Sequence, residues 1–110
     1  MRQIEKQVNQ AILAGKDFKG NNTTVETGAL LWDYSKNEWR KFAAVVRLHG
    51  NIIAAVDFDG CRWFSCAGWH TTTTRSRLAA LGAPVKIKDF TMIRTDTGDV
   101  FPSKLTKFDN

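Results

Sequence analysis

The sequence predicts a single-domain α+β fold in which an antiparallel sheet carries its helices on one face. Apolar residues recur at helical spacing in two segments, one at the N-terminus and one that follows a threonine run. Between them lie runs of alternating apolar and polar residues, separated by turn residues. The predicted order is a helix, a β-meander of four or five strands, a second helix and a C-terminal hairpin. Such an order is typical of an antiparallel sheet, so we predict one domain over residues 1–110.

The first helix is predicted over residues 3–14. One of its faces is apolar, through Ile4, Val8, Ala11 and Ile12. Gly15 follows at the position where a left-handed residue commonly ends a helix. After a loop at residues 20–22, the segment 23–27 is predicted to begin a strand.

The β-meander is predicted in the middle of the chain. Its first strand covers residues 30–34, and a turn at residues 35–38 joins it to a second strand, Trp39 to Leu48. Along that second strand the side chains are predicted to alternate between two faces. One face carries Phe42, Ala44, Val46 and Leu48, and the other carries Lys41, Ala43, Val45 and Arg47.

Two tight turns are predicted to connect the remaining strands of the meander. Gly50–Asn51 is expected to be a two-residue turn, because glycine tolerates positive φ at the first central position. Asp59–Gly60 is a strong hairpin signal. The strands on either side of it run from Ile52 to Phe58 and from Cys61 to Cys66.

The second helix is predicted to begin at one of Thr71, Thr72 or Thr73, whose hydroxyl would cap the first turn. Residues 78–81 form its body, and Gly82 and Pro84 mark its end. The final hairpin is predicted to run from Val85 to Thr95, to turn at residues 96–99 and to return through Val100–Phe101 before Pro102.

Composition excludes several classes of protein. The formal net charge of +5 and the pI of about 9.5 favour an anionic partner, although the basic residues do not form one dense cluster. No apolar run approaches the roughly 18 residues of a membrane span, so no membrane association is expected. The charged N-terminus lacks the apolar stretch of a signal peptide, and we expect a cytosolic product.

Two cysteines and two histidines raise the question of a zinc site. They are His49, Cys61, Cys66 and His70. The cysteines are predicted to lie on one strand with side chains that start on opposite faces, and no Cys-x2-Cys pair is present. We therefore expect two buried or half-buried free thiols, no disulfide, no metal and no other cofactor.

Candidate catalytic groups are few. Asp57 and Asp59 could act as paired carboxylates, but we expect Asp57 on the solvent face and Asp59 in the turn. Cys66 with His70 lacks a third orienting group. The sequence has no glycine-rich phosphate loop and no nucleophile elbow, so we expect a protein that is not an enzyme.

The start of the second helix is the preferred candidate site, because unpaired backbone amides and the helix dipole favour an anion there. Threonine hydroxyls and arginines would donate to a phosphate, and two flat rings would stack on a base. The predicted nucleic-acid or phosphate-binding residues are Trp69, His70, Thr72, Thr73, Thr74, Arg75 and Arg77. The alternative is that the threonines only cap the helix and both arginines are solvated.

A second candidate site is aromatic. The tryptophans and the tyrosine, together with the phenylalanines, exceed what one small core can hold. Trp63 is predicted to lie on the sheet face opposite Phe64, where it is either exposed or covered by the first helix. The residues of this alternative protein interface are Trp32, Tyr34, Trp39 and Trp63.

Two segments resemble a family of small, uncharacterised proteins of tailed bacteriophages. They are Arg47-Leu48-His49-Gly50-Asn51-Ile52-Ile53-Ala54 and Ala67-Gly68-Trp69-His70-Thr71-Thr72-Thr73-Thr74-Arg75-Ser76-Arg77-Leu78. The resemblance spans about residues 1–82. It implies a phage origin and a location in the host bacterial cytoplasm, and it implies no biochemical activity. The hairpin from Leu30 to Lys41 is longer than the family suggests and is expected to carry a specific function.

These observations leave two hypotheses for a non-enzymatic phage accessory protein that acts by binding. The favoured one is a nucleic-acid or nucleotide binder that uses the threonine- and arginine-rich start of the second helix together with a basic, aromatic face. The alternative is an inhibitor of a host bacterial protein, such as a component of anti-phage defence or of transcription, that uses the aromatic residues.

Overall fold

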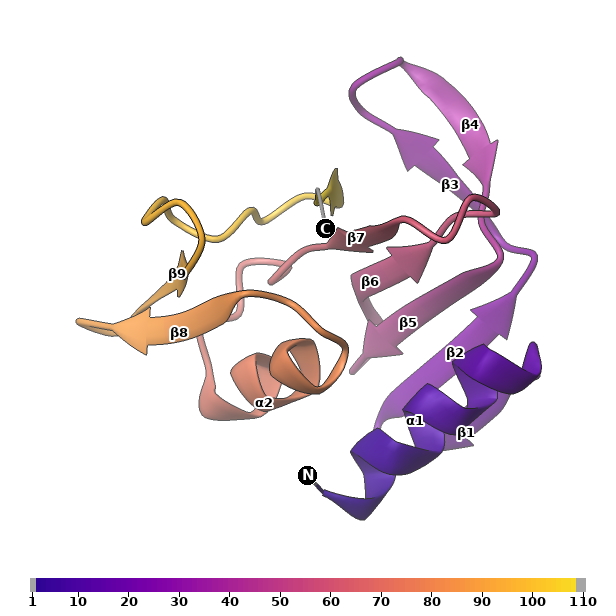
Figure 1. The fold of residues 1–110 in the computed structure, drawn as a ribbon, viewed down its shortest axis with the longest axis horizontal. Helices are drawn as coiled ribbons and strands as arrows, with labels where there is room; N and C mark the ends of the chain where they lie inside the picture. The colour runs from indigo at the N-terminus through magenta and orange to yellow at the C-terminus, as the bar shows by residue number, and fades with distance from the viewer. Residues whose placement is uncertain (1, 109–110) are drawn as a thin grey trace.

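The computed structural model describes residues 2–108 and confirms the α+β class (Figure 1). Its central sheet contains, in spatial order, β1 (Phe18–Gly20), β2 (Thr23–Thr27), β5 (Ala44–Leu48), β6 (Asn51–Val56), β7 (Arg62–Phe64) and β10 (Thr106–Lys107). Two separate hairpins are formed by β3 (Leu30–Asp33) with β4 (Glu38–Lys41) and by β8 (Val85–Lys88) with β9 (Thr91–Arg94). The helices are α1 (Gln3–Ala14) and α2 (Thr72–Ala80). Every strand pairing is antiparallel.

The predicted first helix is confirmed as α1. Its predicted apolar face is buried at Ile4, Val8 and Ala11, whereas Ile12 is half-buried. Gly15 ends the helix with a φ of 64°, the left-handed conformation that its position requires. The glycine amide donates to the carbonyl of Ile12, which would otherwise lack a partner.

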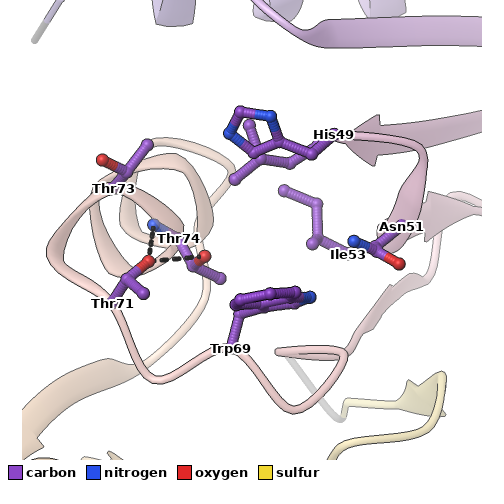
Figure 2. Close-up of a pocket in the computed structure, with 8 residues that line it drawn as sticks. His49, Asn51, Ile53, Trp69, Thr71, Thr73 and Thr74 are labelled. Carbon is purple, nitrogen blue, oxygen red and sulfur yellow. Dashed lines mark hydrogen bonds between the residues drawn. The ribbon is translucent and has the colours of Figure 1, made fainter.

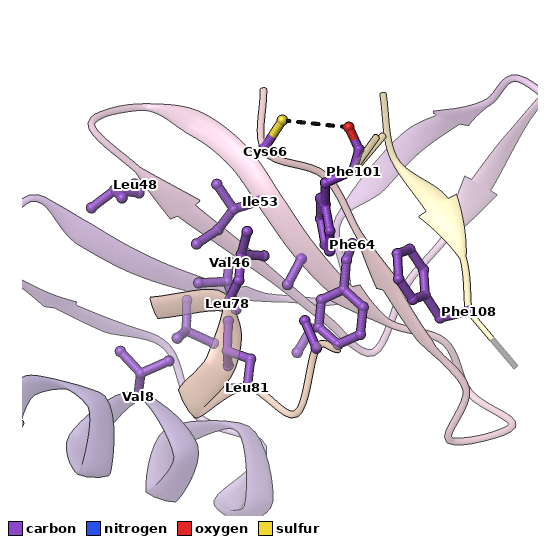
Figure 3. Close-up of a cluster of buried hydrophobic side chains, with 14 of the residues drawn as sticks. Val8, Val46, Leu48, Ile53, Phe64, Cys66, Leu78, Leu81, Phe101 and Phe108 are labelled. Carbon is purple, nitrogen blue, oxygen red and sulfur yellow. Dashed lines mark hydrogen bonds between the residues drawn. The ribbon is translucent and has the colours of Figure 1, made fainter. Parts of the chain in front are cut away.

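Both helices cover one face of the sheet, as predicted. Val46 of β5, Ala54 of β6 and Phe64 of β7 are register partners, so their side chains share this face. Figure 3 shows Val8 of α1, Leu78 of α2 and Leu81, which directly follows α2, among the residues of the core on this face. Leu78 has no exposed surface. This larger core fixes the position of α2 relative to the sheet.

The opposite face of the sheet is also buried, which corrects the expectation that Trp63 could be exposed there. The exposed fraction of Trp63 is only 4%, and its side chain shares a sheet face with its register partners Val45 and Ala55. Leu31 and Phe42 complete this smaller core. The covering element is thus the β3–β4 hairpin and not the first helix, and Trp63 cannot belong to an exposed interface.

The predicted strand from Trp39 to Leu48 is wrong, because the chain changes sheets at Phe42 and Ala43. The amide of Phe42 donates to Ala29, at 2.8 Å, whereas the next amide, of Ala43, donates to Val56, at 2.9 Å. The simple alternation is therefore interrupted. Phe42 packs in the smaller core with Val45, while Ala44, Val46 and Leu48 lie in the larger one.

The predicted turn at Gly50–Asn51 is displaced by one residue. Leu48 pairs with Asn51, so the turn residues are His49 and Gly50. Their φ values of 52° and 80° are both positive, as in a type I′ turn, whose twist matches that of the flanking strands. This shift places His49 at the tip of the hairpin.

The C-terminal part differs from the predicted hairpin in two respects. An additional turn at Asp89–Phe90 divides the predicted strand 85–95 into β8 and β9, and both turn residues have positive φ. The predicted second strand of this hairpin, Val100–Phe101, is reduced to an isolated β-bridge between Ile93 and Val100. The chain then continues past Pro102 and adds β10 to the edge of the central sheet beside β7, a strand that the sequence did not predict.

Candidate functional site

The start of α2 has the predicted threonine cap. Thr71 is the N-cap residue, and its Oγ1 accepts a hydrogen bond from the amide of Thr74 at 3.2 Å. The same hydroxyl donates to Oγ1 of Thr74 at 3.0 Å (Figure 2). These bonds use the hydroxyls of Thr71 and Thr74 within the helix start, and Thr74 is buried. Thr74 is therefore a structural residue, contrary to its predicted role as a phosphate donor.

Arg77 is buried, which contradicts its predicted role in phosphate binding. Its Nη1 lies 2.9 Å from Oε2 of Glu5, and its Nε donates to Oγ1 of Thr23 at 3.3 Å. Ser76 donates to the same Glu5 oxygen at 2.7 Å. The reason is helical periodicity: Arg77 follows Thr74 by three residues and so shares the face of α2 that is turned towards the core.

The charge of Glu5 is stabilised in this cluster. Burial by itself raises the pKa of Glu5, but hydrogen bonds from Ser76, the Arg2 amide and Arg77, together with the charge of Arg77, outweigh burial and lower the pKa. The carboxylate thus remains ionised beside the guanidinium, and the pair joins α1 to α2.

His70 and Arg75 lie outside the cleft that is described next. Nδ1 of His70 accepts a hydrogen bond from the amide of Met92 at 2.8 Å, which ties the start of α2 to β9. Arg75 is half-buried, and Thr72 is exposed. Neither of them lines the cleft described next.

A cleft of about 430 Å³ lies where the β5–β6 turn meets the start of α2. Figure 2 shows His49 and Trp69 on opposite sides of it, with Ile53 between them. The lining residues are Leu48, His49, Asn51, Ile53, Trp69, Thr71, Thr73 and Thr74. They come from the two segments on which the family resemblance was based, so folding brings those segments together.

The sequence predicts the side of this cleft that is formed by the start of α2, but not the side formed by the β5–β6 turn. Trp69, Thr73 and Thr74 are predicted site residues from the helix start, and all three line the cleft. His49 and Asn51 are not among the predicted site residues, although they lie in the segment Leu48-His49-Gly50-Asn51 that carries part of the family resemblance. The only signal was that both segments carry the family resemblance, since nothing local to the turn indicates that it lies beside α2.

The chemistry of the cleft suits a flat ligand with polar edges. Trp69 is 57% exposed and offers an open aromatic face. His49, Asn51 and Thr73 supply hydrogen-bonding groups around an apolar floor at Ile53. Among the described residues no lysine or arginine lines the cleft, so the N–H groups of the first turn of α2 are its main attraction for an anion.

Asp57 is buried, which corrects the expectation that it lies on the solvent face. Its Oδ1 accepts from the amides of Asp59 and Cys61, at 3.0 and 2.9 Å, and its Oδ2 accepts from Nε1 of Trp63 at 3.0 Å. Burial raises the pKa of Asp57, but these bonds and the charge of Lys107 outweigh it and lower the pKa. Asp57 thus organises the turn, while Asp59 is exposed within it.

The cysteines and histidines are dispersed. Cys61 is half-buried, and Cys66 is fully buried with its Sγ 3.8 Å from the carbonyl oxygen of Phe101, as Figure 3 shows. Both are free thiols, as predicted. Within residues 2–108, no group of three or more His, Cys, Asp or Glu side chains is placed to hold a metal ion.

The β3–β4 hairpin exposes three of the four residues of the predicted aromatic interface. Trp32 and Trp39 are cross-strand partners whose rings meet edge to face, with centroids 5.4 Å apart. Trp39 is 67% exposed and Tyr34 is 54% exposed. Large aromatic side chains with this much exposure are typical of binding surfaces.

Comparison with known proteins places the chain in a family of tailed-bacteriophage proteins, through a family model that matches residues 1–108. That family is described as the Kyanoviridae Gp96 protein, and the chain belongs to it. The match extends beyond the residues that carried the resemblance in the sequence. No curated protein and no solved structure matches the chain. None of the helices among the described residues has the length and apolar character needed to span a membrane.

Proposed function

We propose that this protein is a non-enzymatic phage accessory protein that works by binding in the host bacterial cytoplasm. Its ligand is a nucleotide or an unpaired base of a nucleic acid. The observation that carries the proposal is the cleft between His49 and Trp69 at the start of α2.

The size and lining of the cleft support this ligand. A volume of about 430 Å³ lies within the range of small-molecule sites, roughly 300–1,000 Å³. A base can stack on the exposed ring of Trp69 while its polar edge bonds to Asn51, Thr73 or His49. A phosphate attached to that base can approach the amides at the start of α2. Because no lysine or arginine within residues 2–108 lines the cleft, the base rather than the phosphate contributes most of the affinity.

Binding without catalysis is supported by the environment of the reactive side chains. The carboxylate of Asp57 is engaged by three donors in the β6–β7 turn. Cys66 is buried, and His70 uses Nδ1 to hold the amide of Met92. Each of these groups therefore has a structural role that accounts for its position.

The test is the affinity of mononucleotides and short single-stranded oligonucleotides, measured by calorimetry at low salt. Trp69→Ala should weaken binding by about fivefold or more, the scale of one lost base–aromatic stack. Phe58→Ala is the control, because it removes an exposed aromatic ring from the β6–β7 turn, which does not line the cleft, and it should leave the affinity unchanged. Absence of binding to every nucleotide and oligonucleotide tested would refute the proposal.

A second candidate function has its own observation, the exposed edge-to-face pair of Trp32 and Trp39 beside Tyr34. Such a surface fits inhibition of a host bacterial protein, such as a defence or transcription component. Affinity capture from infected cells, with and without nuclease, would identify such a partner. Trp39→Ala should then cost about 2 kcal/mol or more of binding free energy, as central aromatic anchors do, whereas Trp69→Ala should have no effect.

A further inference from the structure

A basic groove separates the β3–β4 hairpin from the C-terminal segment that leads into β10. It encloses about 540 Å³. Its cations are Lys36 and Arg40 on the hairpin and Lys104 and Lys107 on the C-terminal segment. Figure 1 shows the hairpin extending away from both helices, so this groove is a different surface from the cleft at α2.

The positive charge of the basic groove is only partly neutralised. Among the described residues, Asp33 is the one carboxylate that lines the groove, and its Oδ2 lies 3.2 Å from Nε of Arg40. Its other oxygen accepts from the amides of Ser35 and Lys36. No ion pair within residues 2–108 engages Lys36, Lys104 or Lys107. The charge of Lys107 also acts on the buried carboxylate of Asp57, whereas no described ion pair engages Lys36 or Lys104, so the groove keeps positive charge for an anionic ligand.

Aromatic side chains continue this surface. A neighbouring cleft of about 340 Å³ shares Tyr34 and Lys104 with the basic groove and is also lined by Trp32 and Trp39. Nζ of Lys104 lies 4.8 Å from the centroid of the Tyr34 ring. A phosphate held by Lys104 would therefore place an adjoining base close to Tyr34.

We propose that the basic groove, together with this aromatic cleft, binds the backbone and bases of a single-stranded nucleic acid. The inference rests on the proposed function only in taking the ligand to be a nucleic acid. Alternating cations and exposed rings suit a single strand, because its unstacked bases are free to stack on protein aromatics. A duplex keeps its bases stacked internally, and an acidic protein segment would use the lysines but gain little from three flat rings.

The test is the affinity of a labelled oligothymidylate of about 15 nucleotides, measured by fluorescence anisotropy over a range of salt concentrations. The variant carries Lys36→Gln, Lys104→Gln and Lys107→Gln. Each lost phosphate contact lowers the slope of log affinity against log salt by about 0.7, which corresponds to about fivefold in affinity at 0.1 M salt. The triple variant should therefore bind about a hundredfold more weakly at that salt concentration.

The matched control carries Lys6→Gln, Lys86→Gln and Lys88→Gln, three exposed lysines elsewhere on the molecule, so both variants lose the same net charge. Equal affinity of the two triple variants for the oligothymidylate would overturn the proposal that the basic groove binds nucleic acid. If the unaltered protein and the control still bind in that case, the proposed function stands and only the groove fails. If no oligonucleotide binds the unaltered protein at low salt, the proposal for the basic groove fails, and the proposed function fails with it only if no mononucleotide binds either.

Substitutions of Tyr34 test whether the aromatic cleft binds the bases. Tyr34→Ala should weaken oligothymidylate binding by about fivefold or more, and Tyr34→Phe, which keeps the ring, should restore it. A polyglutamate peptide of equal charge should bind more weakly than the oligonucleotide. Equal or tighter binding of the peptide would overturn the proposal in favour of an acidic protein partner.

Discussion

At the scale of single residues, a buried ion pair holds the two helices together. Arg77 and Glu5 are both nearly inaccessible, and Ser76 and Thr23 supply further hydrogen bonds. Because both charges have left water, the loss of one partner leaves the other buried and uncompensated.

Arg77→Ala should therefore lower the free energy of unfolding by about 3–5 kcal/mol, measured by urea denaturation. Arg75→Ala is the control, because Arg75 is only half-buried and has no ion pair within the described part of the chain. It should change the stability by less than about 0.5 kcal/mol. Similar, small effects of the two substitutions would show that the ion pair does not stabilise the native state.

The sequence could not distinguish the two arginines. Both follow the threonine run, and only the rotation of α2 against α1 decides that Arg77 is buried while Arg75 reaches the surface. His49 was likewise not recognised as a site residue, because it lies 20 positions from Trp69 and meets it only through the sheet. Trp69 and the Thr71 cap were predictable, since their signals are local to the helix start.

At the scale of elements, α2 joins the cleft to the larger core. Its first turn lines the cleft, and Leu78, one turn later, is fully buried against the sheet. The helix itself is short, at 9 residues, so its stability must come mainly from this packing.

Leu78→Ala should accordingly destabilise the protein by about 2–5 kcal/mol, through lost burial and the cavity left behind. Leu13→Ala is the matched control, because Leu13 on α1 is 84% exposed. Its effect on the free energy of unfolding should remain within about 0.5 kcal/mol. A loss below that value for Leu78→Ala would mean that a different face of α2 packs on the sheet.

The helices and strands that could be predicted are those whose sequence signals lie within a few neighbouring residues. α1 was predictable with its limits because its apolar spacing and Gly15 act within a few residues. The break at Phe42 was not, because an alternating pattern continues through it and only the change of hydrogen-bonding partner reveals it. The turn at Asp89–Phe90 contains no glycine, and β10, with two residues, exists only through pairing with β7.

At the scale of the whole molecule, buried apolar side chains form two cores. The larger one lies under α1 and α2, and the smaller one lies under the β3–β4 hairpin. Cys61 and Cys66 sit apart from His49, whose hairpin tip borders the cleft. The packing of apolar side chains is therefore expected to be sufficient for stability.

Thermal unfolding curves with and without a strong chelator should thus coincide. Elemental analysis of the same sample checks the result independently. One equivalent of zinc per chain, lost together with the folded structure when the chelator is added, would contradict this prediction.

The response of the whole molecule to acid follows from three buried carboxylates, Glu5, Asp33 and Asp57. Burial alone raises the pKa of each, but hydrogen bonds to the ionised form outweigh it, so each pKa lies below its ordinary value. A group whose pKa is lowered by folding stabilises the native state above its unfolded pKa, near 4, and this stabilisation is lost as the pH falls through the folded pKa. The free energy of unfolding should therefore decrease as the pH falls below about 5.

Asp57→Asn isolates the contribution of one of these carboxylates. At neutral pH the variant should be less stable by about 2 kcal/mol, since Asp57 accepts three hydrogen bonds as a charged group. The asparagine cannot be protonated, so the difference from the unaltered protein should narrow as the pH falls towards about 3. Asp59→Asn, in the exposed part of the same turn, is the control and should leave both the stability and its pH dependence nearly unchanged. A difference between Asp57→Asn and the unaltered protein that stays constant from neutral to acid pH would show that the charge of Asp57 does not stabilise the fold.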